Sequence, residues 1–160
     1  MSSANINIKN NNNKMSVVKL VYRMVRSNSR VIKVVLYRLI RFVYSCDFDP
    51  DCKVGEGISL LHNGLGSVIY AKSIGDNTQI YQNVTIGAGF SRTSKGFPTI
   101  GKNCRIFSGS VIAGKIEIGD NTIIGAKAVV TKSTPPHSIV AGIPATVKRI
   151  MTEDDPYFRK

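Results

Sequence analysis

Residues 100–130, IGKNCRIFSGSVIAGKIEIGDNTIIGAKAVV, place an aliphatic side chain at every sixth position. These positions are Ile100, Ile106, Ile112, Ile118, Ile124 and Val130. A period of six is too short for a repeat built from a helix and a loop, and it is typical of a β-helix, whose short strands form the sides of a coil. Three such hexads make one triangular turn, so we expect each aliphatic residue to point inward and stack on its equivalent in the next turn.

The same period extends upstream, interrupted by a two-residue insertion after Leu60 and by a longer insertion over residues 90–99. The upstream aliphatic positions are Val54, Leu60, Val68, Ile74, Ile80 and Ile86. Glycine often follows them, as in Gly55, Gly75, Gly87, Gly101, Gly119 and Gly125. We expect these glycines and the polar positions to turn the corners, where unusual backbone angles are needed. The fourth place after the aliphatic residue is small or thin: Thr78, Val84, Cys104, Ser110, Thr122 and Ala128. The sequence therefore predicts an all-β solenoid, a parallel β-helix of hexapeptide repeats.

The chain of 160 residues is short enough for one such domain, preceded by a different kind of segment. Residues 1–15 are polar and predict a disordered tail. Residues 16–46 alternate apolar and basic side chains at helical spacing, which predicts a basic amphipathic helical arm. Residues 47–150 then form the β-helix, and residues 151–160 are a C-terminal tail.

The net charge of +12 is concentrated near the N-terminus, because residues 1–46 hold nine basic residues and no acidic ones. Such a block suits an anionic membrane, nucleic acid or an acidic ligand, or it is a solvated helix face. Without interleaved aromatic residues or a known motif, we expect no nucleic-acid partner. We expect a cytoplasmic protein, since neither a signal peptide nor a spanning apolar run is visible. The arm either touches the inner face of the membrane or packs against the assembled protein.

Three cysteines without CxxC spacing and only two histidines do not supply the ligand set typical of a zinc site, so we expect no metal. Five segments carry a resemblance to a known family: DFDPDCKVGEGISLLHNG, IYQNVTIGAG, KGFPTIGKNCRIFSGS, IEIGDNTIIGAKAVV and PPHSIVAGIPATV. They resemble the hexapeptide-repeat acetyltransferases, in the serine acetyltransferase branch that includes polysaccharide O-acetyltransferases. The resemblance implies left-handed coils, a homotrimer with active sites between subunits, and acetyl-coenzyme A as cosubstrate.

Acetyl transfer to an alcohol needs a base, because a neutral hydroxyl is a poor nucleophile, and histidine suits this task. His62 lies at the first insertion and matches the family's catalytic histidine, while Asp47 matches the aspartate that orients it. The alternatives are a corner histidine that only bonds the backbone and a carboxylate that only forms a turn. Asp49 and Asp51 compete for the orienting role. We expect His137 to shape the tail over the last coil.

The resemblance places coenzyme A along Ala88, Ser108 and Ala126, and the chemistry of the thioester and the phosphates adds Gly87, Gly89, Lys132 and Lys148 as candidate contacts. Backbone N–H groups of the glycine turn would stabilise the oxyanion, small side chains would admit the pantetheine arm, and the lysines would meet the phosphates. The alternatives are simple coil packing and solvated lysines. Ala88, Ser108 and Ala126 are expected in successive coils. Arg92 and Lys95 in the long insertion are further candidates for phosphate or acceptor.

Leu61, Asn63 and Phe97 are the expected acceptor contacts. Serine acetyltransferases carry an acid where this chain has Leu61, and an Arg-His pair where it has Gly96 and Phe97. An amino-acid zwitterion would lose its charged partners, whereas an aromatic ring suits an apolar sugar face. We therefore expect an O-acetyltransferase acting on a sugar of a capsule, exopolysaccharide or lipid-linked glycan. Serine O-acetylation and a non-catalytic trimeric scaffold are the alternatives.

Overall fold

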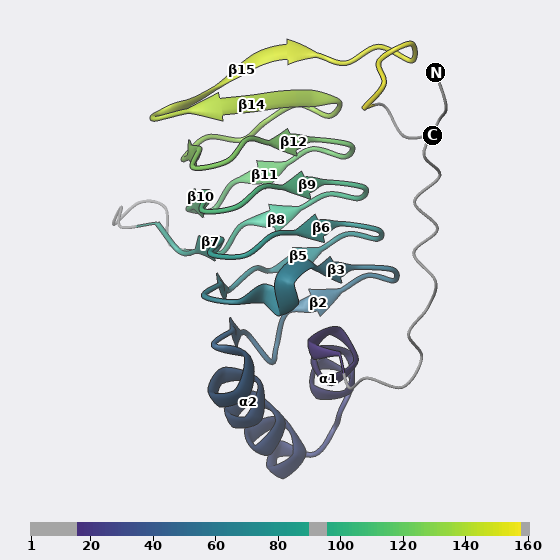
Figure 1. Cartoon of the computed structure of the whole chain (residues 1–160), viewed down its shortest axis with the longest axis vertical. Coiled ribbons are helices and arrows are strands. Elements are labelled where there is room, and N and C mark those ends of the chain that lie inside the picture. Colours follow the sequence, from purple (N-terminus) through teal and green to yellow (C-terminus); the bar gives the residue numbers. More distant parts are fainter. Residues whose placement is uncertain (1–15, 90–95, 158–160) are drawn as a thin grey trace.

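The computed structural model describes residues 16–89 and 96–157, which form a triangular stack of short strands above two helices (Figure 1). The tail 1–15, together with Arg92 and Lys95, lies outside the described residues. Helix α1 (Val17–Val25) begins at Ser16, whose hydroxyl accepts from the Val18 N–H at 3.3 Å. Helix α2 (Arg30–Tyr44) begins in the same way at Ser29. Serine side chains thus satisfy N–H groups that the first helical turn leaves unpaired.

Three sheets, parallel except for the β14–β15 pair, form the sides of the stack. Sheet A consists of β1 (Asp47–Phe48), β4 (Val68–Ile69), β7 (Thr85–Gly87), β10 (Val111–Ala113) and β13 (Val129–Val130). Sheet B consists of β2 (Lys53–Val54), β5 (Ser73–Ile74), β8 (Thr99–Ile100) and β11 (Glu117–Ile118). Sheet C consists of β3 (Ser59–Leu60), β6 (Gln79–Ile80), β9 (Arg105–Ile106), β12 (Ile123–Ile124), β14 (Ser138–Gly142) and β15 (Ala145–Ile150). Consecutive strands from β1 to β13 lie on different sheets, so the chain winds as the expected β-helix.

The core consists of the aliphatic ladders that the six-residue period predicts. Ile100 stands in register with Ile118, and Ile106 with Ile124, and all six aliphatic residues of 100–130 are at most 2 % exposed. The small residues of the fourth repeat position are buried completely: Thr78, Val84, Cys104, Ser110, Thr122 and Ala128. Each turn of the coil therefore buries its interior against the turns above and below it.

The prediction of Val68 as an inward residue is wrong. Val68 is 39 % exposed, whereas Ile69 is fully buried and stands in register with Phe48 and Ile86. The insertion after Leu60 is one residue longer than a count of aliphatic residues suggests, because it contains the 3₁₀ turn η1 (Leu61–Gly64). Because successive strand residues face opposite sides, this single residue exchanges the inner and outer faces of β4.

Except for Gly87, the glycines that follow the aliphatic residues serve close packing rather than unusual backbone angles. A Cβ on Gly75 would lie 2.6 Å from the backbone of Gly101 in the next turn, closer than atoms approach. Left-handed angles occur instead two residues later, at Asn77 (φ 56°) and Asn103 (φ 54°). Asparagine tolerates that region better than other non-glycine residues, so corner bending falls to it.

The last turn of the coil is covered by the antiparallel hairpin of β14 and β15. His137 has φ 58°, its N–H donates to the Asp120 carbonyl at 2.8 Å, and its carbonyl accepts from the N–H of the buried Met151. This backbone role agrees with the expectation that His137 shapes the tail. Arg149 pairs with Asp155 and ties down the segment after β15.

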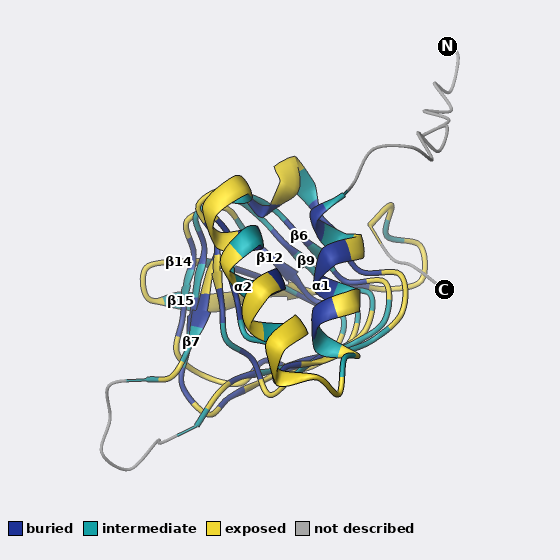
Figure 2. Ribbon diagram, turned by 90° about the horizontal axis from the view of Figure 1, so that it is seen from below, coloured by how far each residue is buried: buried dark blue, intermediate teal, exposed yellow. Residues whose placement is uncertain are grey.

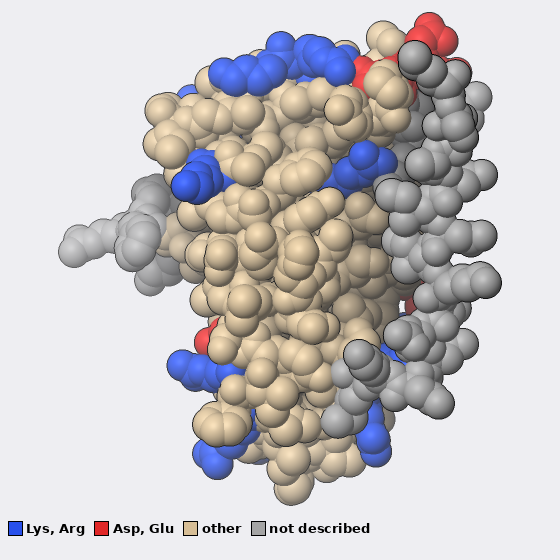
Figure 3. All heavy atoms as spheres, viewed as in Figure 1, with Lys and Arg blue, Asp and Glu red and all other residues tan. Residues whose placement is uncertain are grey.

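The helical arm covers the base of the coil but leaves much of its own apolar surface uncovered. The α1 residues Val17, Leu20, Val21 and Met24 are buried, whereas α2 buries only Leu36 and Ile40. The side of α2 that faces away from the coil is largely exposed in the view from below (Figure 2). In Figure 3, Lys and Arg gather over the helices and over the β14–β15 end, and the coil between them is mostly uncharged on this face.

Candidate functional site

His62 lies in an unusual turn at the edge that joins sheet C to sheet A, here called the His62 edge (residues 61–66, 81–84, 107–110 and 125–128). Both His62 (φ 54°, ψ 33°) and Asn63 (φ 57°, ψ 24°) adopt left-handed backbone angles, while most other corners have one such residue. The His62 side chain is exposed, and its carbonyl accepts from the Leu65 N–H at 3.2 Å. Two consecutive non-glycine residues in this region are strained, which is a feature of functional sites.

Asp47 begins β1, directly beside this turn. The N–H of Asp47 donates to the Ser67 carbonyl at 2.8 Å, and the Gly66 N–H donates to the Ser45 carbonyl at 2.9 Å. Because the next residue, Phe48, points into the core, the Asp47 side chain lies on the outer face of sheet A. The structure thus brings Asp47 close to the His62 turn, although within the described residues no hydrogen bond joins the two side chains.

The Asp47 carboxylate has other partners. It accepts a hydrogen bond from the Tyr70 hydroxyl at 2.9 Å and lies 3.9 Å from a guanidinium nitrogen of Arg41 on α2. The competing carboxylates are otherwise engaged: Asp49 accepts from the N–H of Asp51, and Asp51 accepts from Lys33 at 2.7 Å. Of the three aspartates, only Asp47 lies directly beside the His62 turn, because its N–H donates to the Ser67 carbonyl that follows the turn.

Sequence reasoning missed Tyr70, although a signal was present. Tyr70 follows the inward residue of its strand, and the next two turns of sheet A have Gly87 and Ala113 at the paired position. A bulky aromatic residue at a position that is otherwise small indicates that the outer surface of sheet A has a special contact in this turn. Burial, followed by hydrogen bonds to Tyr37 and Asp47, raises the pKa of Tyr70 above its usual range, so its hydroxyl stays protonated.

The expected coenzyme A contacts lie on two edges of the coil. Ser108 and Ala126 belong to the His62 edge, where the Lys127 N–H donates to the Ser108 carbonyl at 3.0 Å. Ala88 follows β7 and lies across sheet A, at the edge that leads to sheet B, here called the loop edge (residues 49–52, 70–72, 88–89, 96–98 and 114–116). The expectation of one position per successive turn therefore holds for Ser108 and Ala126, whereas Ala88 lies on a different edge of the coil. A count along the chain does not separate a corner after sheet A from a corner after sheet C.

The two glycines around Ala88 have different surroundings. A Cβ on Gly87 would meet no atom within 4 Å, whereas a Cβ on Gly89 would lie 3.0 Å from the Gly114 Cα. Gly87 therefore borders open space, as a ligand-binding position requires. Gly89 serves close packing of the coil.

The two expected phosphate-binding lysines lie near the C-terminal end of the coil. Lys132 lines a hollow of about 310 Å³ beneath the β14–β15 hairpin, together with Thr146. The Lys148 ammonium donates to the Thr146 hydroxyl at 2.9 Å. Both side chains are exposed, so they are accessible to an anion.

The expected acceptor residues also divide between the two edges. Leu61 and Asn63 flank His62, whereas Phe97 lies at the loop edge, with its ring centroid 6.2 Å from that of Tyr70. These two rings line an open hollow of about 920 Å³ that does not include His62. The charged residues of this hollow are Asp49, Asp51, Lys53, Lys72, Lys115 and Glu117.

The cysteines take no part in the site. Cys46, Cys52 and Cys104 are free and buried, and burial raises the pKa of each thiol to about 12. Such thiols are poor nucleophiles at neutral pH. In the described ranges 16–89 and 96–157, no group of three or more His, Cys, Asp or Glu side chains is arranged to hold a metal ion.

Comparison with known proteins agrees with this geometry. Residues 97–132 match the family model described as bacterial transferase hexapeptide (six repeats). The chain is 36 % identical to a serine acetyltransferase of Staphylococcus epidermidis over 80 % of its length and 60 % of the relative. It is 32 % identical to serine acetyltransferase 2 of Arabidopsis thaliana over 89 % of its length and 44 % of that relative. A serine acetyltransferase structure from Vibrio cholerae superimposes with a TM-score of 0.76 at 27 % identity, covering 88 % of this chain and 56 % of that one.

The fold is a left-handed β-helix of hexapeptide repeats, and the chain is similar to the class of hexapeptide-repeat transferases. Within that class, the expected similarity to the serine acetyltransferase-like branch is confirmed. The chain spans about half the length of the relatives that it matches.

Proposed function

We propose that this protein is an O-acetyltransferase that transfers an acetyl group from acetyl-coenzyme A to a hydroxyl, with His62 as the general base. The observation that carries the proposal is the strained, exposed turn of His62 directly beside Asp47. The similarity to serine acetyltransferases over most of the chain supports the same activity.

The reaction follows from these groups. His62 takes the proton of the acceptor hydroxyl as the oxygen attacks the thioester carbonyl carbon. The carbonyl oxygen gains the negative charge, which backbone N–H groups near Gly87 stabilise. The C–S bond then breaks as the carbonyl re-forms, and the imidazolium returns its proton to the departing thiolate. Asp47 orients the imidazole and stabilises its charged form.

A homotrimer explains why the coenzyme A positions lie on two edges. The width of sheet A separates one pair of positions, Ser108 and Ala126, from the other pair, Gly87 and Ala88. One pantetheine arm therefore reaches both pairs more readily if the two pairs come from different subunits. In such an assembly the loop edge of one subunit faces the His62 edge of the next. Phe97 of one subunit would then approach Leu61 and the His62 turn of its neighbour.

Serine is the acceptor that the comparisons favour over the sugar expected from the sequence, because the relatives are serine acetyltransferases. The charged residues of the hollow beside Phe97 also weaken the argument that an amino acid would lack polar partners. A sugar hydroxyl stays the second candidate. Leu61 stands beside His62, and the rings of Tyr70 and Phe97 offer an aromatic surface of the kind that packs on sugars.

Coenzyme A release with L-serine, compared with a panel of hexoses and N-acetylhexosamines, tests the acceptor. Turnover of serine alone selects the first candidate, and turnover of sugars alone selects the second. No turnover with any hydroxyl compound, combined with no binding of acetyl-coenzyme A by calorimetry, would support the non-catalytic scaffold instead.

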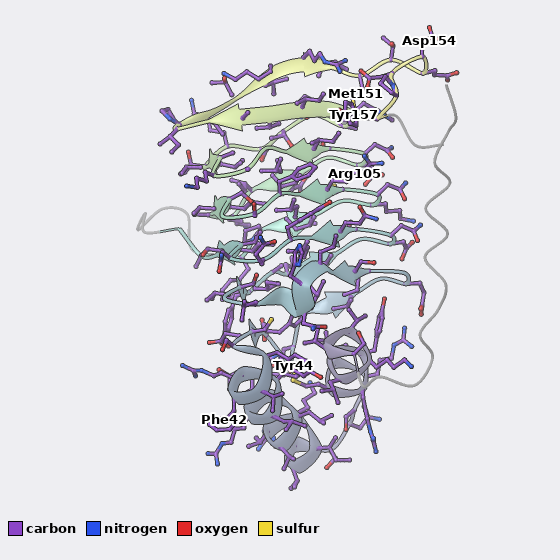
Figure 4. All side chains as sticks on the ribbon, in the orientation of Figure 1. Phe42, Tyr44, Arg105, Met151, Asp154 and Tyr157 are labelled. Carbon is purple, nitrogen blue, oxygen red and sulfur yellow. The ribbon has the colours of Figure 1, made fainter. Side chains whose placement is uncertain are left out.

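The exposed face of α2 supports a further partner, an anionic membrane surface. Phe42 is 90 %, Val31 72 % and Val35 57 % exposed, and Phe42 projects from the outer side of α2 in Figure 4. The arm 16–46 contains no acidic residue, so two copies meeting through this face would repel each other, whereas anionic lipid would attract it. Within the described residues no helix is long and apolar enough to cross a bilayer. The cytoplasmic location stays a prediction.

Vesicle sedimentation tests this contact. We expect binding to vesicles containing phosphatidylserine but not to pure phosphatidylcholine vesicles, with weakening in high salt and on Phe42→Ala replacement. Equal sedimentation with both lipids, or a Phe42-dependent association of the protein with itself in the absence of lipid, would contradict it.

A further inference from the structure

Four polar side chains form a closed ring where the helical arm meets the coil. The Tyr70 hydroxyl lies 2.9 Å from Asp47 Oδ1, and the Tyr37 hydroxyl lies 3.4 Å from that of Tyr70. Arg41 Nη1 lies 3.3 Å from the Tyr37 hydroxyl and 3.9 Å from Asp47 Oδ2. Two members of the ring come from α2, one from β1 and one from the residue after β4, so the arm contributes directly to the surroundings of Asp47.

The donors of the ring can be assigned from its chemistry. An ionised carboxylate only accepts, so the Tyr70 hydroxyl donates its single proton to Asp47. The Tyr70 oxygen then accepts from the Tyr37 hydroxyl, whose own oxygen accepts from Arg41. Arginine has only donors, so the hydrogen bonds run in one direction, from Arg41 through the two tyrosines to the carboxylate. Each donor in the ring thus has its own acceptor. The ring holds Asp47 from both of its oxygens and leaves further lone pairs of the carboxylate available.

We propose that Tyr70 is a positioning residue for acetyl transfer, acting through Asp47. The Asp47 side chain is 21 % exposed, so without the ring it would rotate at the surface. The charge-assisted bond from Tyr70 fixes the carboxylate while its backbone is already held beside the His62 turn. The remaining lone pairs can then serve the imidazole of His62. The inference rests on the proposed function, and it makes the arm part of the active-site framework rather than only a cap on the coil.

A purely structural role for the ring is the competing explanation, and the chain contains a matched control for it. Tyr22 of α1 also joins the arm to the coil: its hydroxyl donates to the Gly55 carbonyl at 2.8 Å and accepts from the Ile58 N–H at 3.1 Å. Loss of this hydroxyl removes two hydrogen bonds between arm and coil, neither of which involves Asp47. Tyr70→Phe likewise removes only a hydroxyl, because the ring that packs near Phe97 is retained.

Steady-state kinetics of the full chain, with the acceptor that it turns over, tests the proposal. We expect Tyr70→Phe to lower kcat about tenfold, the effect of one charge-assisted hydrogen bond, with the KM for acetyl-coenzyme A unchanged. Tyr22→Phe should lower the melting temperature comparably and leave kcat as it is. In an Asp47→Asn background, Tyr70→Phe should have no further effect on kcat, because its partner has already been altered.

Two results would overturn the inference. One is an unchanged kcat in Tyr70→Phe, and the other is a full tenfold loss that persists in the Asp47→Asn background, which would mean that Tyr70 acts on substrate directly. Full activity of a His62→Asn variant would instead remove the proposed function itself, so the two failures are distinguishable.

Discussion

Ile69 stands in register with Ile86 and is completely buried, while Val68 beside it faces outward. Adjacent residues of similar size thus have opposite places in the coil. Ile69→Ala removes packed atoms from the ladder of sheet A and should lower the free energy of unfolding by about 2–5 kcal/mol. Val68→Ala should change it by less than about 1 kcal/mol, measured by urea unfolding. Similar losses for both variants would contradict this register.

Glycines at the same repeat position should differ in how they tolerate a methyl group. Gly75→Ala places a Cβ 2.6 Å from backbone of the next turn, which cannot move aside as a side chain can, so we expect a loss of about 2 kcal/mol or more. Gly87→Ala meets no atom within 4 Å and should keep full stability. If Gly87 borders the thioester, this stable variant should still show a raised KM for acetyl-coenzyme A. An unchanged KM would remove Gly87 from the binding surface.

The coil and its irregular turns differ in how well the sequence predicts them. The spacing of Ile100 to Val130 predicts the coil and its core, because only a six-residue repeat buries every sixth side chain. The same counting fails at Val68 and Ala88, because the length of an irregular turn depends on its backbone conformation, which spacing does not contain. Tyr70 was missed for a related reason: its contact with Asp47 depends on the register of β4 against β1, which the irregular turn after Leu60 sets.

The buried thiols predict how stability depends on pH. Burial raises the pKa of Cys104 to about 12, against about 8.5 for an exposed thiol in the unfolded chain. The folded state therefore keeps its proton where the unfolded state loses it, so this contribution to stability is complete below about pH 8.5 and is lost as pH rises toward 12. The free energy of unfolding, measured in urea, should therefore be lower at pH 10.5 than at pH 8. In Cys104→Ala, the free energy of unfolding should fall less steeply with pH, by ~1.4 kcal/mol per pH unit. An unaltered slope would contradict the raised pKa of the Cys104 thiol.

His62→Asn separates the chemistry of the base from the strain of its turn. Asparagine occupies left-handed corners of this coil at positions 77, 83, 103 and 121, so it should preserve the backbone at position 62 while removing the base. We expect kcat to fall by about 10²–10⁴ with little change in melting temperature. His137→Asn is the matched control: it makes the same replacement at the other left-handed histidine (φ 58°), which lies over the last coil, so kcat should stay within a few-fold. Retained turnover in His62→Asn, or an equal loss in His137→Asn, would contradict the assignment of the His62 imidazole as the base.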